Sequence, residues 1–265
     1  MSEIQNYVIN DVRPLVISND GLVTVSFYSA YPSTDDWIGA YSPAPAVTEV
    51  FSTVPVKFGY CTWGEQSTYL QDGSGELIFN FTNLRANITF YYFTGGFYWP
   101  ATFNTTKLVA TSPLNVSFFD FNQPLRNRVV PTGNYDIYNV LWSAAYNAEP
   151  TLRWGITNGT YNTWVGATVS SVAQSSMCAA PANSTGWRDL GNIYTAEIVG
   201  ILSLNLGGSY IYYIFGDAAT NTWSSETAFW VPPNRGASPK DRATRVVVLA
   251  DTGVGSNGWS SQTCK

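Results

Sequence analysis

Histidine is absent from all 265 residues of the sequence. It is the commonest general base and transition-metal ligand in proteins, so its absence removes the Ser/His/Asp and Cys/His arrangements of nucleophilic catalysis. The usual ligand sets for zinc and iron are removed as well. We therefore expect no catalytic residue, no cofactor and no metal site, and we predict that the chain as given is not an enzyme.

Charge and long apolar runs are also scarce. Charged residues make up 12% of the chain, and 13 Lys and Arg against 18 Asp and Glu give a net charge of −5. The lack of a basic run argues against nucleic acid and anionic membranes as partners. No apolar stretch reaches the roughly 18 residues that span a bilayer. No secretory segment follows Met1, so we expect that a signal was removed or that the chain begins at an arbitrary point.

Cysteine occurs three times, and no two of the cysteines form a CxxC pair, which excludes a zinc ribbon. In a secreted chain an odd number implies one disulfide and one free or intermolecular thiol. The alternative is three ordinary buried thiols. The pairing stays open among the candidates Cys61, Cys178 and Cys264.

Aromatic and turn-forming residues are abundant instead. Hydrophobic residues reach 45% and aromatics 15%, with 22 Gly and 14 Pro. This composition favours strands and tight turns, and it predicts an all-β fold of two tandem β-sandwiches of the immunoglobulin or fibronectin type III kind, plus a short C-terminal strand. Together with six N-glycosylation sequons it predicts a secreted glycoprotein that carries N-linked glycans. The sequons are at Asn80, Asn87, Asn104, Asn115, Asn158 and Asn183.

Strand and turn patterns divide the chain into four parts. Residues 1–112 predict an N-terminal sandwich of about seven strands, including a hairpin around Asn19–Gly21 and strands at 37–41, 75–82 and 88–94. Residues 113–128 predict an extended crossing that packs between domains. Residues 129–234 predict a fibronectin type III-like domain, with strands at 163–172 and 193–199 and a corner at Tyr210 whose hydroxyl bonds back to the backbone. Residues 235–265 are a tail.

One strand in the tail has no predicted partner. The run RVVVLAD is continuously apolar, which is typical of a strand buried on both faces. No helix pattern follows it, so we expect it to pair with a sheet outside this chain. The predicted assembly strand consists of Arg245, Val246, Val247, Val248, Leu249, Ala250 and Asp251.

Four segments, taken in order, resemble the high-molecular-weight purple acid phosphatases of plants and protists. They are PSTDDWIGAYSP (32–43), LRANITFYYFTGG (84–96), SMCAAPANSTGWRDLGNIYTAEI (176–198) and RVVVLADTG (245–253). The resemblance covers nearly the whole chain. It implies that a first β domain and a fibronectin-like domain precede a separate metallophosphatase domain, which alone is catalytic.

The same resemblance leaves almost no metal ligand in this chain. The first of the family's five metal motifs, GDxG, reads Ala250-Asp251-Thr252-Gly253 here, with Ala in place of the first Gly. Asp251 is therefore the only position onto which a ligand can be carried, and a lone carboxylate does not hold a transition metal against water. The chain also has Tyr194 where the family commonly has His, and Leu190 where it has Pro.

Other candidate sites have structural explanations. Asp35-Asp36, beside Trp37, is interpreted as a turn element, and Gly216-Asp217 as a hairpin turn despite its likeness to a phosphatase motif. Exposed aromatics could form a carbohydrate platform, although aromatics at a period of two are mostly core residues. The aromatics concerned are Trp63, Tyr98, Trp99, Trp164 and Trp223.

Two hypotheses of function follow. The first is an extracellular structural module that assembles with itself into a filament, its apolar strand adding to the edge of the next subunit. The second is the front scaffold of a secreted di-metal phosphatase, whose partner is a downstream catalytic domain. The sequence slightly favours the first.

Overall fold

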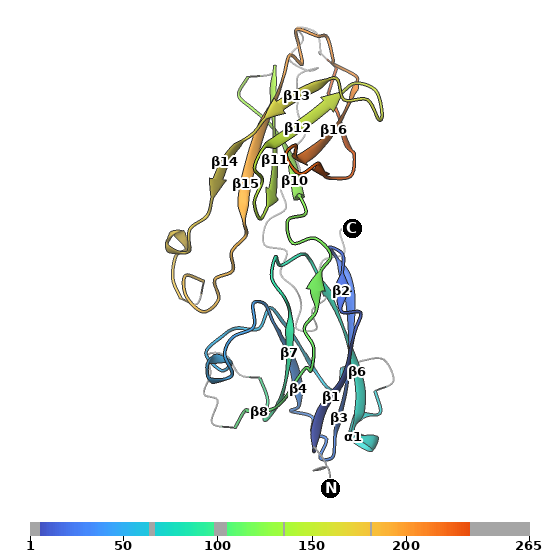
Figure 1. The fold of residues 1–265 in the computed structure, drawn as a ribbon, viewed down its shortest axis with the longest axis vertical. Coiled ribbons are helices and arrows are strands. Elements are labelled where there is room, and N and C mark those ends of the chain that lie inside the picture. The colour runs from blue at the N-terminus through green and yellow to red at the C-terminus, as the bar shows by residue number, and fades with distance from the viewer. Residues whose placement is uncertain (1–5, 64–66, 98–104, 135, 181, 234–265) are drawn as a thin grey trace, which may run out of the picture.

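The computed structural model describes residues 6–63, 67–97, 105–134, 136–180 and 182–233, and its strands form two domains that lie end to end (Figure 1). Strand pairing stays within residues 7–118 or within residues 125–230. Among the described residues the helical elements are one short helix, α1 (Tyr69–Asp72), and the 3-10 turns η1 (Val47–Glu49) and η2 (Gln174–Ser176). The predicted all-β fold class is confirmed.

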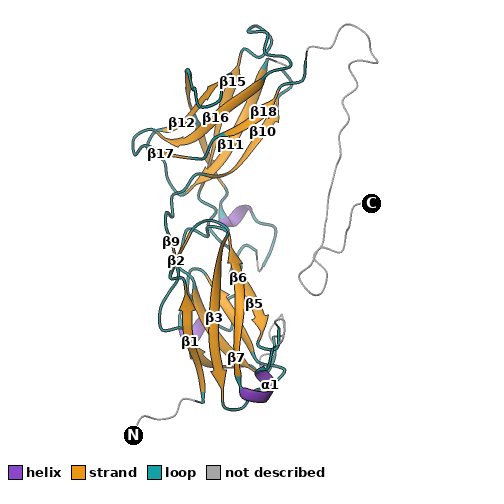
Figure 2. Cartoon of the chain, turned by 90° about the vertical axis from the view of Figure 1, so that its right-hand side faces the viewer, coloured by secondary structure: helices purple, strands orange, loops and turns teal. Residues whose placement is uncertain are grey.

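The first domain packs a three-stranded sheet, β1–β3–β6, against a four-stranded sheet, β5–β4–β7–β8. A separate parallel pair, β2 with β9, lies at the end that faces the second domain (Figure 2). The strands are β1 (Tyr7–Arg13), β2 (Val16–Ile17), β3 (Gly21–Ser29), β4 (Trp37–Tyr41), β5 (Lys57–Tyr60), β6 (Ser74–Phe81), β7 (Thr89–Thr94), β8 (Lys107–Thr111) and β9 (Ser117–Phe118).

Strand β4 is buried on both faces. Because successive side chains of a strand point to opposite faces, Ile38 and Ala40 enter the main core of the first domain, while Trp37 and Tyr41 enter a second, aromatic cluster. In that cluster the Trp37 ring stacks on Phe93 at 4.1 Å. The first domain therefore has aromatic packing on both sides of its four-stranded sheet.

The predicted hairpin around Asn19–Gly21 is wrong in its pairing. The turn forms, since the Gly21 N–H donates to the Ser18 carbonyl at 3.0 Å. The antiparallel partners of β3, however, are β1 and β6, and β2 pairs with β9. Pro14 has no N–H for a sheet ladder, and β1 ends just before it, at Arg13.

The second domain packs the sheet β10–β11–β15–β14 against the sheet β13–β12–β16–β17, with β18 also paired to β16. Its main core is built from residues such as Trp142, Leu152 and Tyr213. The strands are β10 (Leu125–Pro131), β11 (Ile137–Ala144), β12 (Pro150–Gly155), β13 (Thr163–Gly166), β14 (Thr168–Ser171), β15 (Asn192–Val199), β16 (Tyr210–Asp217), β17 (Thr222–Trp223) and β18 (Thr227–Trp230).

The single strand predicted at 163–172 is two strands in different sheets. β13 pairs with β12, whereas β14 pairs with β15 across the sandwich. The chain changes sheet at Ala167, whose N–H donates to the Pro150 carbonyl at 2.8 Å. The side chains of β13 and β14 are largely exposed, so no buried face holds this segment to one sheet.

The predicted tyrosine corner is also wrong. Tyr210 is 54% exposed, and its hydroxyl makes no hydrogen bond within the described part of the chain. Among the described residues of the second domain, the tyrosine whose hydroxyl bonds to the backbone is Tyr194 of β15, which accepts the Asn147 N–H at 2.8 Å. Its ring stacks on Trp142 at 5.6 Å. The residue that replaces the family's His is thus part of the core.

The residues that the structure describes include no helix that is both long and apolar enough to cross a membrane. The predicted assembly strand, Arg245–Asp251, and the rest of the tail lie outside the described residues.

Candidate functional site: the cavity at the domain junction

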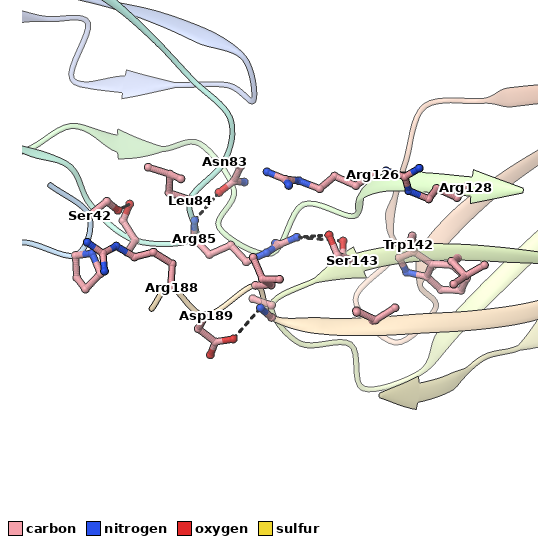
Figure 3. Close-up of a pocket in the computed structure, with 17 residues that line it drawn as sticks. Ser42, Asn83, Leu84, Arg85, Arg126, Arg128, Trp142, Ser143, Arg188 and Asp189 are labelled. Carbon is pink, nitrogen blue, oxygen red and sulfur yellow. Dashed lines mark hydrogen bonds between the residues drawn. The ribbon is translucent and has the colours of Figure 1, made fainter. Parts of the chain in front are cut away.

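A cavity of about 540 Å³ lies where the two domains meet. Its walls come from the β6–β7 loop of the first domain, from β10 and β11, and from the long β14–β15 loop of the second domain. Four arginines line it, and Figure 3 shows Arg126 and Arg128 on β10, with Arg85 reaching Ser143. The arginines are Arg85, Arg126, Arg128 and Arg188.

Arg85 joins the first domain to the second. Its guanidinium donates to the carbonyls of Phe121 (2.8 Å) and Gln123 (3.3 Å) in the connecting segment, and to the carbonyl (3.1 Å) and hydroxyl (3.3 Å) of Ser143 on β11. Burial lowers the pKa of Arg85, and the neighbouring positive charge of Arg126 lowers it further. A half-buried guanidinium with this many acceptors helps to fix the geometry of the junction.

Arg188 makes a second contact between the domains. The β14–β15 loop reaches from the second domain to the first, and there Arg188 donates to the Val54 carbonyl at 2.8 Å (Figure 1). Within its own loop Arg188 donates to the carbonyls of Thr185 (3.0 Å) and Trp187 (2.6 Å). The WRDL segment that carried part of the family resemblance is therefore an interdomain contact.

The connecting segment is itself packed. Asn83 donates from its side chain to the Asp120 carbonyl at 2.6 Å, and the Tyr146 N–H donates to the Asn122 side chain at 2.7 Å. Residues 113–128 were expected to be an extended crossing, and within them β9 belongs to the first domain and β10 begins the second.

The sequence-predicted glycosylation sites are on the surface where the structure describes them. Three of their side-chain amides are engaged: Asn80 Nδ2 donates to the Asp20 carbonyl at 2.8 Å, Asn158 Nδ2 donates to Glu226 at 2.6 Å, and Asn115 Oδ1 accepts the Thr89 hydroxyl at 2.7 Å. Asn104 lies outside the described residues. The exposed sequon asparagines are Asn80, Asn87, Asn115, Asn158 and Asn183.

Two of the three disulfide candidates are free thiols. Cys61 is buried in the first domain, and burial raises its pKa, whereas Cys178 is exposed in the β14–β15 loop. The two are therefore not paired with each other. Cys264 lies outside the described residues.

Asp36 is buried in the first domain. One carboxylate oxygen accepts hydrogen bonds from the Tyr69 hydroxyl and the Ser33 N–H. The Asp36 N–H donates to the Ser33 carbonyl at 3.2 Å. Burial raises the pKa of Asp36, although the two hydrogen bonds oppose the shift. The interpretation of Asp35-Asp36 as a turn element is confirmed by these bonds.

Of the five aromatics considered as a carbohydrate platform, the three that the structure describes belong to two different domains. Trp63 packs beside Tyr60 in the first domain, whereas Trp164 and Trp223 belong to the second domain. There the Arg153 guanidinium lies between the two indoles, 3.6 Å and 3.8 Å from their ring centres. Tyr98 and Trp99 lie outside the described residues.

The described residues do not fit a di-metal centre. Within them no group of three or more His, Cys, Asp or Glu side chains could hold a metal ion. Asp251, the only ligand position that the resemblance supplies, lies outside that part of the chain. No catalytic step through a metal can therefore be derived for these residues.

A family model described as "Fn3-like domain from Purple Acid Phosphatase" matches residues 9–119. These residues form an Fn3-like domain of the purple acid phosphatase type. They correspond to the sandwich β1–β9, whereas the fibronectin type III-like domain was predicted at residues 129–234.

The likeness extends over both domains. The chain is 32% identical to "probable inactive purple acid phosphatase 1" of Arabidopsis thaliana over 94% of its own length, and 30% identical to "probable inactive purple acid phosphatase 27" of the same plant over 99%. The solved purple acid phosphatase from yellow lupin seeds superposes with a TM-score of 0.74 and 29% identity over 88% of the chain.

The chain spans less than half the length of these purple acid phosphatases: 42% and 45% of the two Arabidopsis proteins and 42% of the lupin chain. The resemblance to the non-catalytic N-terminal half of this family is thus confirmed. The residues that sequence reasoning missed are the cavity arginines, because they come from separate segments and share no motif.

Proposed function

We propose that residues 1–265 form a non-catalytic, extracellular two-domain platform that holds other parts of a protein assembly in a fixed orientation. The observation that carries this proposal is the absence of histidine from the whole sequence. Purple acid phosphatase chemistry, as the resemblance implies it, needs several histidine ligands. The Arabidopsis relatives are named "probable inactive", which also supports a non-catalytic role.

The packed junction supports the platform role. Two domains of one chain usually move relative to each other unless the interface between them is extensive. Here Arg85, Arg188 and Asn83 bond to backbone carbonyls across or along the junction. Such a junction holds the two domains in one relative orientation. A platform beneath a catalytic domain or within a surface assembly requires this.

Mass and metal binding test the proposal. We expect that the chain does not bind iron, manganese or zinc ions stoichiometrically and that it shows no metal-dependent hydrolysis of a phosphomonoester.

For the native protein, deglycosylation should lower the mass measured by mass spectrometry, as expected of an extracellular glycoprotein. A deglycosylated mass near 29.1 kDa indicates a free-standing module, and about twice that value indicates a scaffold joined to a catalytic domain. Stoichiometric metal with hydrolysis would overturn the non-catalytic role.

A second candidate is self-assembly by strand exchange. It rests on the continuously apolar run at 245–251, which has the pattern of a strand buried on both faces. Burying each of its Val and Leu side chains stabilises an assembly by roughly 1.5–3 kcal/mol. Adding this strand to the edge of the next subunit makes a head-to-tail contact, which gives open filaments.

Deleting residues 243–265 is expected to abolish such assembly, as measured by light scattering and electron microscopy. Cys264→Ser is the control, since it removes the thiol and leaves the apolar strand intact. Filaments that survive the deletion contradict strand exchange. Filaments lost equally in Cys264→Ser show that a disulfide, and not the strand, joins the subunits.

A further inference from the structure

The junction cavity concentrates positive charge in an acidic protein. The chain carries a net charge of −5, yet four of its 13 Lys and Arg residues line this one cavity. Asp189 is the acidic residue in the lining, and its carboxylate already accepts the Gly191 N–H at 2.8 Å. The charge of the cavity walls is therefore strongly positive, which attracts anions.

The four arginines have no carboxylate partner within the described residues, where the ion pairs involve Arg13. Arg85 and Arg188 are used by the fold, because they donate to backbone carbonyls. Arg126 and Arg128 are exposed on β10. The Arg126 guanidinium makes one weak bond, at 3.3 Å, to the Thr82 hydroxyl, and the Arg128 guanidinium makes no hydrogen bond to any residue the structure describes. Two guanidinium groups are thus free for a ligand.

Two buried donors in the same walls also lack acceptors. The Trp142 indole N–H belongs to a side chain that is 1% exposed, and it has no partner among the described residues. Arg188 Nε is buried and equally without a partner. A buried donor without an acceptor is destabilising. Both atoms are closed to solvent, so an oxygen of a cavity ligand reaches them only when the neighbouring side chains shift.

The rest of the lining is apolar. Pro43, Leu84, Leu141, Leu190 and Ile193 contribute to the walls. A volume of about 540 Å³ suits a small organic molecule and exceeds what an inorganic ion alone occupies. Apolar walls and a positive rim together select a ligand that has an apolar body and an anionic group.

We propose that the domain junction binds a small organic anion, with its phosphate, sulfate or carboxylate group held by Arg126 and Arg128 and its apolar body in the cavity. Guanidinium forks match all three headgroups through paired hydrogen bonds. Because both domains contribute walls, the bound anion also stiffens the junction. This binding site does not depend on the non-catalytic role proposed above.

Calorimetric titration of the full chain with phenyl phosphate, phenyl sulfate and benzoate tests the proposal. We expect one saturable site, weakened by salt, with tighter binding of phenyl phosphate than of inorganic phosphate and no binding of phenol. Arg126→Gln with Arg128→Gln should weaken binding about tenfold or more, because it removes both guanidinium groups that hold the anionic group. The matched pair Lys57→Gln with Lys107→Gln removes the same charge outside the cavity and should leave the affinity unchanged.

A second measurement locates the ligand. The indole N–H signal of Trp142, assigned in NMR spectra with Trp142→Phe, should shift on titration with phenyl phosphate. Absence of saturable binding, equal weakening by both charge-removing pairs, or an unmoved Trp142 signal at saturation overturns the proposal. Unchanged thermal unfolding of the Arg126/Arg128 variant shows that a loss of affinity does not come from misfolding.

Discussion

Replacing Arg85 by alanine is expected to release the two domains from their fixed orientation. The Arg85 guanidinium bonds to the carbonyls of Phe121, Gln123 and Ser143, and its removal leaves these exposed or partly buried groups without this donor. We expect a loss of roughly 1–3 kcal/mol in the free energy of unfolding. Small-angle scattering should show a broader distribution of interdomain distances, and denaturant unfolding should separate into two transitions.

Two variants control for charge and for position. Arg85→Lys keeps the positive charge but cannot present the planar fork that reaches several acceptors, so we expect a partial loss. Arg126→Ala removes a neighbouring exposed arginine whose bond to Thr82 is weak, and we expect little change in domain orientation. An Arg85→Ala protein with the same scattering profile and one unfolding transition would show that other contacts hold the junction.

Replacing Asp217 by alanine is expected to destabilise the second domain by roughly 3 kcal/mol. Asp217 ends β16 and is 1% exposed. Its carboxylate accepts the backbone N–H groups of Glu149 (2.8 Å), Ala148 (3.2 Å) and Ala219 (3.2 Å). Each buried group left without a partner costs about 1–3 kcal/mol. Urea unfolding at neutral pH measures the loss, and Asp189→Ala, in an exposed loop, is the control.

The effect of Asp217→Ala should depend on pH. Burial alone would raise the pKa of Asp217, but the hydrogen bonds from Glu149, Ala148, Ala219 and Thr220 together lower it below 3.8. A carboxyl group whose pKa is lower in the folded state contributes stability above its unfolded pKa and loses it as the pH falls through the folded value. The difference between wild type and variant should therefore shrink on acidification below about pH 4. A difference that stays constant from pH 7 to pH 3 contradicts this role.

The strand positions in this protein are largely a local property of the sequence. The strand predicted at 37–41 is β4, with the same bounds, and those expected at 75–82, 88–94 and 193–199 coincide with β6, β7 and β15 to within one residue at each end. They could be predicted because a strand alternates its side chains with a period of two, which is visible over a few residues. The missing histidines and the family segments are equally readable from the chain.

Only the tertiary structure decided which surfaces meet. The sequence could not show that β3 pairs with β1, that 163–172 divides between two sheets, or that Tyr194 and not Tyr210 bonds to the backbone. Nor could it bring Arg85, Arg126 and Arg188 to one cavity, since they come from three separate segments. Side-chain alternation determines which residues of a strand face the core. The strands that pack against that face depend on the path of the chain between strands. For this reason the sequence determined the β architecture, and the packing of the two domains created the cavity.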